Sequence, residues 1–369
     1  MADVEIGRYK TARRAYGFDE VVIVPSRRTR DPQDVSIGWE LDAFRFELPF
    51  LAAPMDSVVS PATAIAIGRL GGLGVLNLEG LWTRYADPEP VLAEIAALDE
   101  GVATRRLQEI YREPVHEELI GARLAEIRAA GVPVAGALSP QRTVEFHKVV
   151  IEAGVDLFVI RGTVVSAEHV STRAEPLNLK EFIYELDVPV VVGGCATYQA
   201  ALHLMRTGAA GVLVGVGTGL AHTGRRVIGI GLPMATAVVE VAAARRDYLD
   251  ESGGRYVHVV ADGGMRTSAD IAKAVALGAD GVMLGLPLAR ASEAPGRGFH
   301  WGHDAYHPDL PRGSRIEVGT VGSLAEVLIG PSATADGQAN LFGALRRTMA
   351  STGYRDLKEF QKVEVALAP

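Results

Sequence analysis

His222 is the residue of this sequence whose type and surroundings best suit proton transfer. It lies in a glycine-rich stretch, residues 215–231, that reads GVGTGLAHTGRRVIGIG. An imidazole changes charge near neutral pH, so it can take up and return a proton, and Arg225 and Arg226 add two cations suited to phosphate. The plainer alternative is an exposed histidine beside two solvated arginines in a mobile loop.

The chain has a single cysteine, Cys195, directly after the run VVVGG. A thiolate is a nucleophile, but a lone cysteine is more often a small buried hydrophobe, and no nearby feature would lower its pKa. One cysteine cannot form a disulfide within the chain. This usage favours a reducing compartment, so a cytoplasmic location is expected.

Residues 291–322 are rich in glycine, proline, histidine and arginine and lack regular periodicity. Such a segment is typical of a flap or lid that covers a substrate. His300, His303 and His307 suggest a metal site, but they do not share a predicted helix and no cysteine or matched acidic set accompanies them. No metal is therefore expected.

Two further apolar runs end in residues suited to a phosphorylated sugar. The first ends in Ala261–Gly264 (ADGG), and the second ends at Gly285. Glycines allow backbone N–H groups to approach an anion, while Asp262 can accept hydrogen bonds from a ribose diol. The alternative is that these glycines only form tight turns.

Secondary-structure elements must bring these residues to one place. Eight short apolar runs are the candidates for such elements. They lack strict alternation, as expected of parallel strands that are covered on both faces. Helical patterns lie between them, with Ser60, Ser139 and Ser268 as capping residues. The predicted strands are 49–53, 74–78, 133–138, 155–160, 188–192, 211–215, 257–261 and 281–285.

The order of the runs predicts an α/β fold of the (β/α)8 TIM-barrel type, one domain over residues 1–369. Segments 152–162, 206–217 and 276–287 repeat one pattern, in which a helix ends at a glycine and a strand follows. Two doubly wound sheets would need a linker that is not evident. A charged, mainly helical stretch, 79–131, separates the second and third strands.

Composition limits the partners. The 369 residues are 48% hydrophobic and 22% charged, with a net charge of -8 and no block of like charge. A nucleic acid or an anionic membrane surface is thus not expected as a partner. The first residues lack the apolar stretch of a signal peptide, and no run is long enough to span a membrane.

At these same residues the sequence resembles the IMP dehydrogenase/GMP reductase family along nearly its whole length. The family's regulatory CBS pair, usually inserted after the second strand, does not fit in 79–131. The chain is therefore similar to barrel-only members, and most to the IMP dehydrogenase-related proteins of actinobacteria. The matching segments are 16–21, 53–58, 71–74, 229–233, 261–264, 270–274 and 293–296.

The resemblance implies hydride transfer between a purine 5′-monophosphate and NAD or NADP, as part of GMP biosynthesis and purine metabolism. IMP is the first expectation and GMP the alternative; family members form tetramers, so a homo-oligomer is expected. The positions carried over are Met55, Gly217, Gly219, Asp262, Gly263, Gly264 and Gly285 for substrate, Arg161 and Gly194 for the cofactor, and His222, Thr223, Arg312 and Arg315 for catalysis.

Several of these positions differ from the family pattern. His222 stands where the family has its nucleophilic cysteine, and Arg161 where it has an aspartate that holds the cofactor ribose. Two functions stay open: an oxidoreductase with an altered mechanism, and a nucleotide-binding or regulatory barrel without turnover. The other departures are Gly194 for asparagine, Leu220 and Leu286 for two serines, Gly224 for threonine, and no tyrosine after Arg312 or Arg315.

Overall fold

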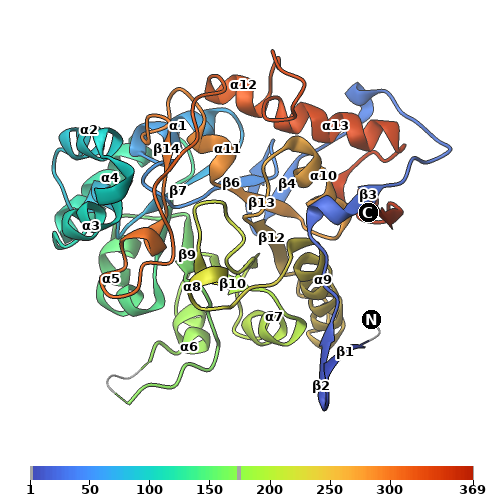
Figure 1. The fold of residues 1–369 in the computed structure, drawn as a ribbon, viewed down its shortest axis with the longest axis horizontal. Helices are drawn as coiled ribbons and strands as arrows, with labels where there is room; N and C mark the ends of the chain where they lie inside the picture. Colours follow the sequence, from blue (N-terminus) through green and yellow to red (C-terminus); the bar gives the residue numbers. More distant parts are fainter. Residues whose placement is uncertain (1–2, 173–175, 369) are drawn as a thin grey trace.

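The computed structural model describes residues 3–172 and 176–368, whose centre is a closed barrel of eight parallel strands (Figure 1). The strands follow one another in sequence order, and the last pairs with the first. The predicted single-domain TIM barrel is confirmed. Its strands are β6 (Phe50–Ala52), β7 (Leu73–Asn77), β8 (Ala135–Leu138), β9 (Leu157–Arg161), β10 (Val190–Cys195), β11 (Gly211–Val214), β12 (His258–Asp262) and β13 (Gly281–Leu284).

Helices surround the barrel and cover the outer faces of the strands (Figure 1). The strands are consequently buried on both sides, and large side chains such as Phe50 and Phe158 have no exposed surface. Each side chain of this size contributes roughly 1.5–3 kcal/mol by leaving water. The surrounding helices are α1 (Pro61–Arg69), α4 (Glu117–Ala129), α5 (Pro140–Glu152), α6 (Leu179–Tyr184), α7 (Tyr198–Met205), α9 (Met234–Glu251), α10 (Ser268–Ala276) and α13 (Leu341–Ser351).

Short elements lie at both ends of the barrel and on the side near the chain ends, with α11 directly after β13 at the carboxyl end. Trp39 on β4 donates a hydrogen bond to His258 at the start of β12, over 3.4 Å. The sheet formed by β3 and β16 packs beside α10. These elements are η1 (Phe18–Glu20), β3 (Val21–Ile23), η2 (Pro32–Asp34), β4 (Trp39–Leu41), β5 (Phe44–Phe46), α11 (Leu286–Ala289), α12 (Leu324–Leu328), α14 (Leu357–Phe360) and β16 (Val365–Leu367).

The predicted helix starts are largely confirmed. Ser60 and Ser139 each accept a hydrogen bond from a backbone N–H in the first turn of α1 and α5. Ser268 was assigned wrongly, because α10 already begins at that residue and Thr267 precedes it. The N–H and hydroxyl of Thr267 both donate to Asp270, which explains the earlier start.

Replacing Ser60 with alanine is expected to lower the free energy of unfolding by about 1–2 kcal/mol. The Ser60 hydroxyl accepts from the N–H of Thr63 at 3.0 Å, and that N–H would lose its partner in a buried place. Urea unfolding measures the change. Ser332→Ala, in an exposed turn, is the control that should leave the midpoint unchanged.

The long insertion between β7 and β8 folds into η3 (Leu81–Thr83), α2 (Glu89–Ala97), α3 (Glu100–Ile110) and α4, so the helical prediction for 79–131 is confirmed. Its side chains hold the late segment 299–317 in place. Buried Trp301 donates from Nε1 to the hydroxyl of Tyr111 at 2.9 Å, and the rings of Tyr111 and Tyr306 stack with centroids 3.5 Å apart.

The late segment contains more regular structure than its sequence suggested. It forms β14 (Phe299–His300), η4 (His303–Tyr306) and β15 (Ile316–Glu317), and β14 pairs with β15. Gly313 bridges to His222. The segment therefore packs at the end of the barrel where the glycine-rich stretch lies.

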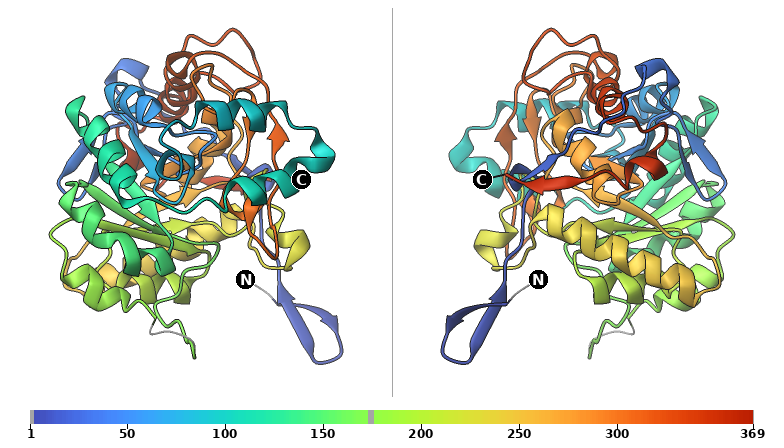
Figure 2. Two further views of the ribbon diagram at one scale, coloured as in Figure 1. Left: turned by 90° about the vertical axis from the view of Figure 1, so that its left-hand side faces the viewer. Right: turned by 90° about the vertical axis from the view of Figure 1, so that its right-hand side faces the viewer.

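An antiparallel hairpin of β1 (Asp3–Gly7) and β2 (Lys10–Arg13) projects from the body of the molecule (Figure 2). Residues 4–13 are all exposed. Among the described residues, no helix has the length and apolarity needed to cross a bilayer.

Candidate active site

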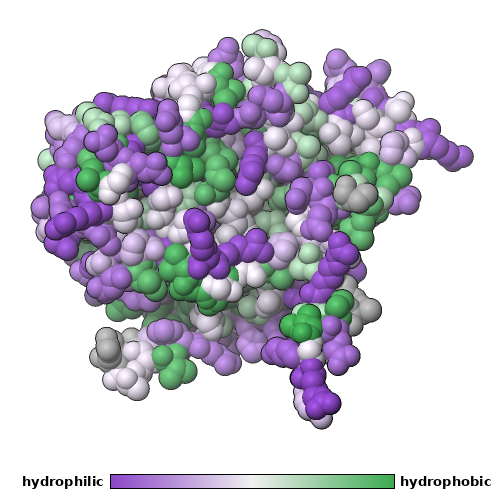
Figure 3. Space-filling model, in the orientation of Figure 1, coloured by the Kyte–Doolittle hydropathy of each residue, from purple (hydrophilic) through white to green (hydrophobic). Residues whose placement is uncertain are grey.

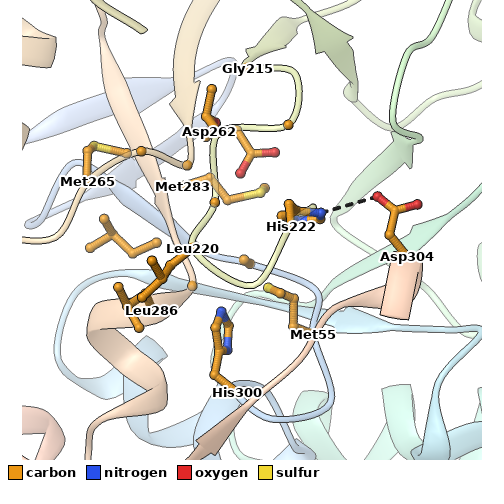
Figure 4. Close-up of a pocket in the computed structure, with 18 of the residues that line it drawn as sticks. Met55, Gly215, Leu220, His222, Asp262, Met265, Met283, Leu286, His300 and Asp304 are labelled. Atoms are coloured by element: carbon orange, nitrogen blue, oxygen red, sulfur yellow. Dashed lines mark hydrogen bonds and ion pairs between the residues drawn. The ribbon is translucent and has the colours of Figure 1, made fainter. Parts of the chain in front are cut away.

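A pocket opens at the carboxyl ends of the barrel strands, where this fold binds its ligands (Figure 4). All seven predicted substrate-binding residues line it, together with His222 and Arg161. The lining residues used below are Met55, Arg161, Thr163, Gly217, Gly219, Leu220, His222, Asp262, Gly263, Gly264, Met265, Gly285, Leu286, His300, His303 and Asp304.

His222 and Asp304 form the central pair of the pocket (Figure 4). Nδ1 of His222 lies 3.2 Å from Oδ2 of Asp304. Since the carboxylate can only accept, Nδ1 carries the hydrogen and Nε2 is left as the proton acceptor. A carboxylate that fixes the tautomer and orientation of an imidazole is the arrangement by which histidine becomes an effective general base.

Asp304 is the hub of a buried polar network. Its Oδ1 lies 2.5 Å from the guanidinium of Arg312, and the Thr163 hydroxyl donates to both of its oxygens at 3.1 and 3.2 Å. Burial alone would raise the pKa of Asp304, but the hydrogen bond with His222 and the charges around it hold that pKa well below its usual range. Asp304 therefore stays a carboxylate and can stabilise a protonated His222.

Arg161 and Asp262 face each other across the same pocket. Nε of Arg161 lies 3.6 Å from Oδ2 of Asp262, and both side chains are largely buried. Arg161 also approaches Nδ1 of His303 at 3.5 Å. The Asp262 carboxylate, which is predicted to bind a ribose diol, thus has a cationic neighbour at Oδ2. Its other oxygen can still accept hydrogen bonds from a ligand.

One end of the pocket is apolar. Leu220, Met265 and Leu286 lie near one another there (Figure 4). Two glycines of the pocket wall have no room for a side chain: a Cβ on Gly264 would lie 2.8 Å from Met234, and one on Gly285 would lie 3.1 Å from the sulfur of Met55. An anion at this end would be held by backbone N–H groups rather than by hydroxyls.

His300 is a buried histidine that also lines the pocket. Its Nδ1 lies 3.0 Å from the Ser57 hydroxyl. Burial, assisted by the charge of His222, lowers the pKa of His300 to about 3. His300 is therefore neutral at physiological pH and offers a hydrogen-bonding group without charge.

Acid should destabilise the protein partly through His300. Its pKa is about 3 in the folded chain against 6.5 for a free histidine, so between these values the unfolded state binds the extra proton and stability falls as the pH falls. His300→Asn should make the decline from pH 6.5 to 4 shallower, by up to about 1.4 kcal/mol per pH unit. Urea unfolding at several pH values measures this slope, and an unchanged slope would contradict the assignment. The exposed His203→Asn is the control.

A comparison with protein families matches residues 15–314 to the IMP dehydrogenase / GMP reductase domain. The chain belongs to this family. Because the matched region runs from before the barrel to the segment that carries Asp304, both halves of the His222–Asp304 pair lie within the family domain. The protein is thus an IMP dehydrogenase/GMP reductase-family oxidoreductase by descent.

Relatives agree with the family assignment. The chain is 56% identical to an uncharacterized oxidoreductase of Mycobacterium tuberculosis strain H37Rv, over 98% of each chain. It is 28% identical to an inosine-5′-monophosphate dehydrogenase of Methanocaldococcus jannaschii, over 95% of this chain and 92% of that one. A crystal structure of an IMP dehydrogenase/GMP reductase-like protein from Corynebacterium glutamicum superposes with a TM-score of 0.94 at 49% identity, covering 99% of this chain and 98% of that one.

Four of the catalytic and cofactor positions carried over from the family do not line the pocket. Thr223 is tied to Arg312 through its backbone N–H, and Arg312 acts on the pocket only through Asp304. Gly194 is buried within β10. Arg315 turns away from the pocket: it donates to the carbonyl of Leu98 and stacks over Phe299 at 4.1 Å.

Cys195 is not placed as a nucleophile in this family member. Its side chain is buried and donates to the carbonyl of Leu213. Burial raises the pKa of its thiol to about 12, so the thiolate is scarce at neutral pH. Since it is the only cysteine of the chain, no cysteine is available to this pocket.

Replacing Cys195 with alanine is accordingly expected to leave nucleotide binding and turnover within about twofold, with only a packing cost to stability. Steady-state rates and thermal unfolding of the two proteins test this. Loss of turnover without unfolding would restore Cys195 as a catalytic candidate.

A second cavity adjoins the pocket and shares Arg161 and His303 with it. It lies beside the β7–β9 strand ends and the insertion helices. Its lining includes three guanidinium groups, those of Arg84, Arg112 and Arg142, beside the stacked pair of Tyr111 and Tyr306. The sequence reasoning did not find this cavity, because the insertion brings these side chains there from a distant part of the chain.

Sequence reasoning also missed Asp304 and Thr163 as site residues. The one signal for Asp304 was an acidic residue next to His303 in the segment GHDAYH. Within residues 3–172 and 176–368, no group of three or more histidine, cysteine, aspartate or glutamate side chains is arranged to hold a metal ion.

Proposed function

We propose that the protein transfers hydride between a purine 5′-monophosphate, IMP in the first place, and NAD or NADP. One observation carries the proposal: two cavities meet at Arg161 and His303, one with a histidine–carboxylate pair and the other with guanidinium groups. Hydride transfer between two bound molecules needs such adjoining sites, because the reacting atoms must lie in contact.

In the first cavity the purine nucleotide is held at the strand ends. Asp262 accepts from the ribose, and the backbone around Gly264 and Gly285 receives the phosphate. His300 provides an uncharged hydrogen-bonding group at the opposite wall. This arrangement follows the family positions that line the pocket and leaves His222 free for chemistry.

The second cavity fits a dinucleotide through its charges. Arg112 and Arg142, the latter also paired with Glu145, are the guanidinium groups that would hold the pyrophosphate. Arg161, at the junction, would face a ribose of the cofactor and would favour the extra phosphate of NADP. A nicotinamide cofactor held there would supply or accept the hydride. The role of the chain there is to position the nicotinamide ring and exclude water.

The chemistry of His222 replaces that of the family's cysteine. In the IMP direction, Nε2 of His222 takes a proton from the water that adds at purine C2, while the C2 hydrogen leaves as hydride. Atoms and electrons balance: IMP, water and the oxidised cofactor give XMP, the reduced cofactor and one proton. Asp304 stabilises the imidazolium that forms. In this proposal, the function of the lid segment 291–322 is to place Asp304 in the pocket.

Two measurements on the purified chain test the proposal. Calorimetry with IMP, GMP and inosine measures binding, and absorbance of the reduced cofactor measures turnover with each pairing of IMP or GMP with NAD or NADP. We expect binding of a purine monophosphate and turnover with one cofactor. GMP with reduced cofactor as the productive pair would make the protein a GMP reductase.

A nucleotide-binding barrel without turnover is the second candidate function. The observation that favours it is the Arg161–Asp262 contact, which places a cation beside the ribose-binding carboxylate. Nucleotide binding with no hydride transfer in any pairing would support this function. Absence of binding by any purine monophosphate would overturn both.

A further inference from the structure

Asp56 is a buried carboxyl group in the loop between β6 and α1. It is 2% exposed, and it accepts hydrogen bonds from two neutral side chains, the Tyr111 hydroxyl at 2.6 Å and Nδ2 of Asn77 at 3.3 Å. Burial raises the pKa of Asp56 to about 6, so the group is mainly ionised at neutral pH. A buried carboxylate held by neutral groups costs stability, and the fold alone gives no reason for a charge at this position.

Hydrogen bonds of fixed direction connect Trp301 to Asp56. The indole Nε1 of Trp301 can only donate, and it donates to the Tyr111 hydroxyl at 2.9 Å. That hydroxyl donates in turn to Oδ2 of Asp56, and 2.6 Å is in the range of a charge-assisted O–H···O⁻ bond. Because a carboxylate can only accept, the charge of Asp56 sets the direction of both bonds.

The backbone of Trp301 is held by Ser57, the residue that follows Asp56. The Ser57 hydroxyl donates to the carbonyl of Trp301 at 3.1 Å, and the N–H of Trp301 donates to the same hydroxyl at 3.3 Å. Two adjacent residues at the end of β6 therefore hold Trp301 by both its side chain and its backbone. Two residues further along the chain, η4 begins at His303 and carries Asp304.

These hydrogen bonds are shielded from water. Trp301 and Tyr111 are 1% and 7% exposed, and α3 packs against η4. The outer surface over the insertion helices α2–α4 is mostly hydrophilic (Figure 3), as expected of helices whose other side is buried. Water is therefore poorly placed to replace a hydrogen-bonding group that is removed from this interior.

We propose that Asp56 is a positioning residue for the His222–Asp304 pair. It holds Trp301 through the Tyr111 hydroxyl, and Trp301 fixes the segment from which Asp304 reaches His222. Asp56 lines neither cavity, so it acts on the reaction only through this pair. Its effect on the rate rests on the proposed function, whereas its effect on the segment does not.

Two variants break the hydrogen-bond connection with little change in side-chain shape. Asp56→Asn removes the charge, and Tyr111→Phe removes the joining hydroxyl but keeps the ring that stacks on Tyr306. Each should lower kcat severalfold with the KM for IMP unchanged. The double variant should lose no more than the more affected single variant, because both act on the same connection. In a His222→Ala background neither should lower the rate further, since the base through which they act is absent.

Hydrogen exchange followed by mass spectrometry tests the holding role without any turnover. Amides of residues 299–317 should exchange faster in Asp56→Asn and Tyr111→Phe than in the wild type, whereas those of 258–262 should be unaffected. Tyr256→Phe is the matched control, because the Tyr256 hydroxyl donates to the buried Asp280 at 2.7 Å at the other end of the barrel. It should leave both the exchange of 299–317 and kcat unchanged.

Two results would overturn the proposal. One is wild-type exchange across 299–317 in both variants, and the other is a further fall in rate when either change is added to His222→Ala, which would indicate a general structural effect. Urea unfolding verifies that each variant is folded. A wild type that binds nucleotide without turnover would overturn the proposed reaction instead, and the exchange measurement would still decide whether Asp56 holds the segment.

Discussion

His222→Ala is expected to reduce turnover of the purine monophosphate by roughly 10²–10⁴-fold, the usual contribution of a general acid–base group. The loss should appear in kcat, with little change in KM or in nucleotide affinity, because the proposed role of His222 begins when water attacks purine C2. Alanine leaves Asp304 without its imidazole partner and gives the water no proton acceptor. Initial rates with saturating IMP and cofactor, together with calorimetry of nucleotide binding, measure both quantities.

The control for this substitution is His203→Ala. His203 is half exposed on α7, remote from the pocket lining, and its one carboxylate contact is a 3.8 Å approach to Glu168. Its removal should leave rates and affinity unchanged. A His222→Ala protein that turns over at the wild-type rate would remove His222 from the chemistry, whereas loss of nucleotide binding would make it a binding residue.

Asp304→Asn is expected to lower kcat by roughly 10²-fold or more, since an orienting carboxylate acts through the base that it holds. The amide keeps the shape of the side chain but loses the charge that stabilises a protonated His222. It can also donate to Nδ1, which would leave Nε2 carrying the hydrogen and unable to accept one. The rate as a function of pH is the informative measurement, because a purely structural role would lower the rate equally at every pH.

A milder variant separates the effect of Asp304 on the orientation of His222 from its effect on the stability of the fold. Thr163→Val removes one neutral hydroxyl from Asp304 and keeps the carboxylate, so a severalfold fall in kcat is expected. If Asp304→Asn unfolds, because it leaves the Arg312 guanidinium without its charge partner, Thr163→Val still tests the network. Unchanged rates and pH profiles in both folded variants would show that the network serves folding alone.

The barrel was predictable from sequence because its signals are local. Each buried strand is a short apolar run, and Ser60 and Ser139 mark helix starts through contacts within one turn. The placement of Asp262 followed from the same reasoning, because the carboxyl ends of parallel strands meet at one end of a barrel. Neither inference required knowledge of distant contacts.

The pairings inside the site were not predictable in this way. Asp304 reaches His222 only because Trp301 and Tyr306 fix the late segment against α3, and no short pattern encodes that contact. Arg161 and Asp262 are likewise brought together from the ends of β9 and β12, between which two other strands lie. Strand patterns predict where a side chain emerges, but the partner that it meets depends on packing across the whole mouth.

The stacking of Tyr306 on Tyr111 means that the carboxylate beside His222 is steadied from outside the barrel strands, by a residue that directly follows α3 and also lines the second cavity. Substitutions in α3 are therefore expected to change how firmly Asp304 is held beside His222, while the residues that line the first pocket stay the same. The eight-stranded barrel can stay constant while changes in this helix alter the reaction rate.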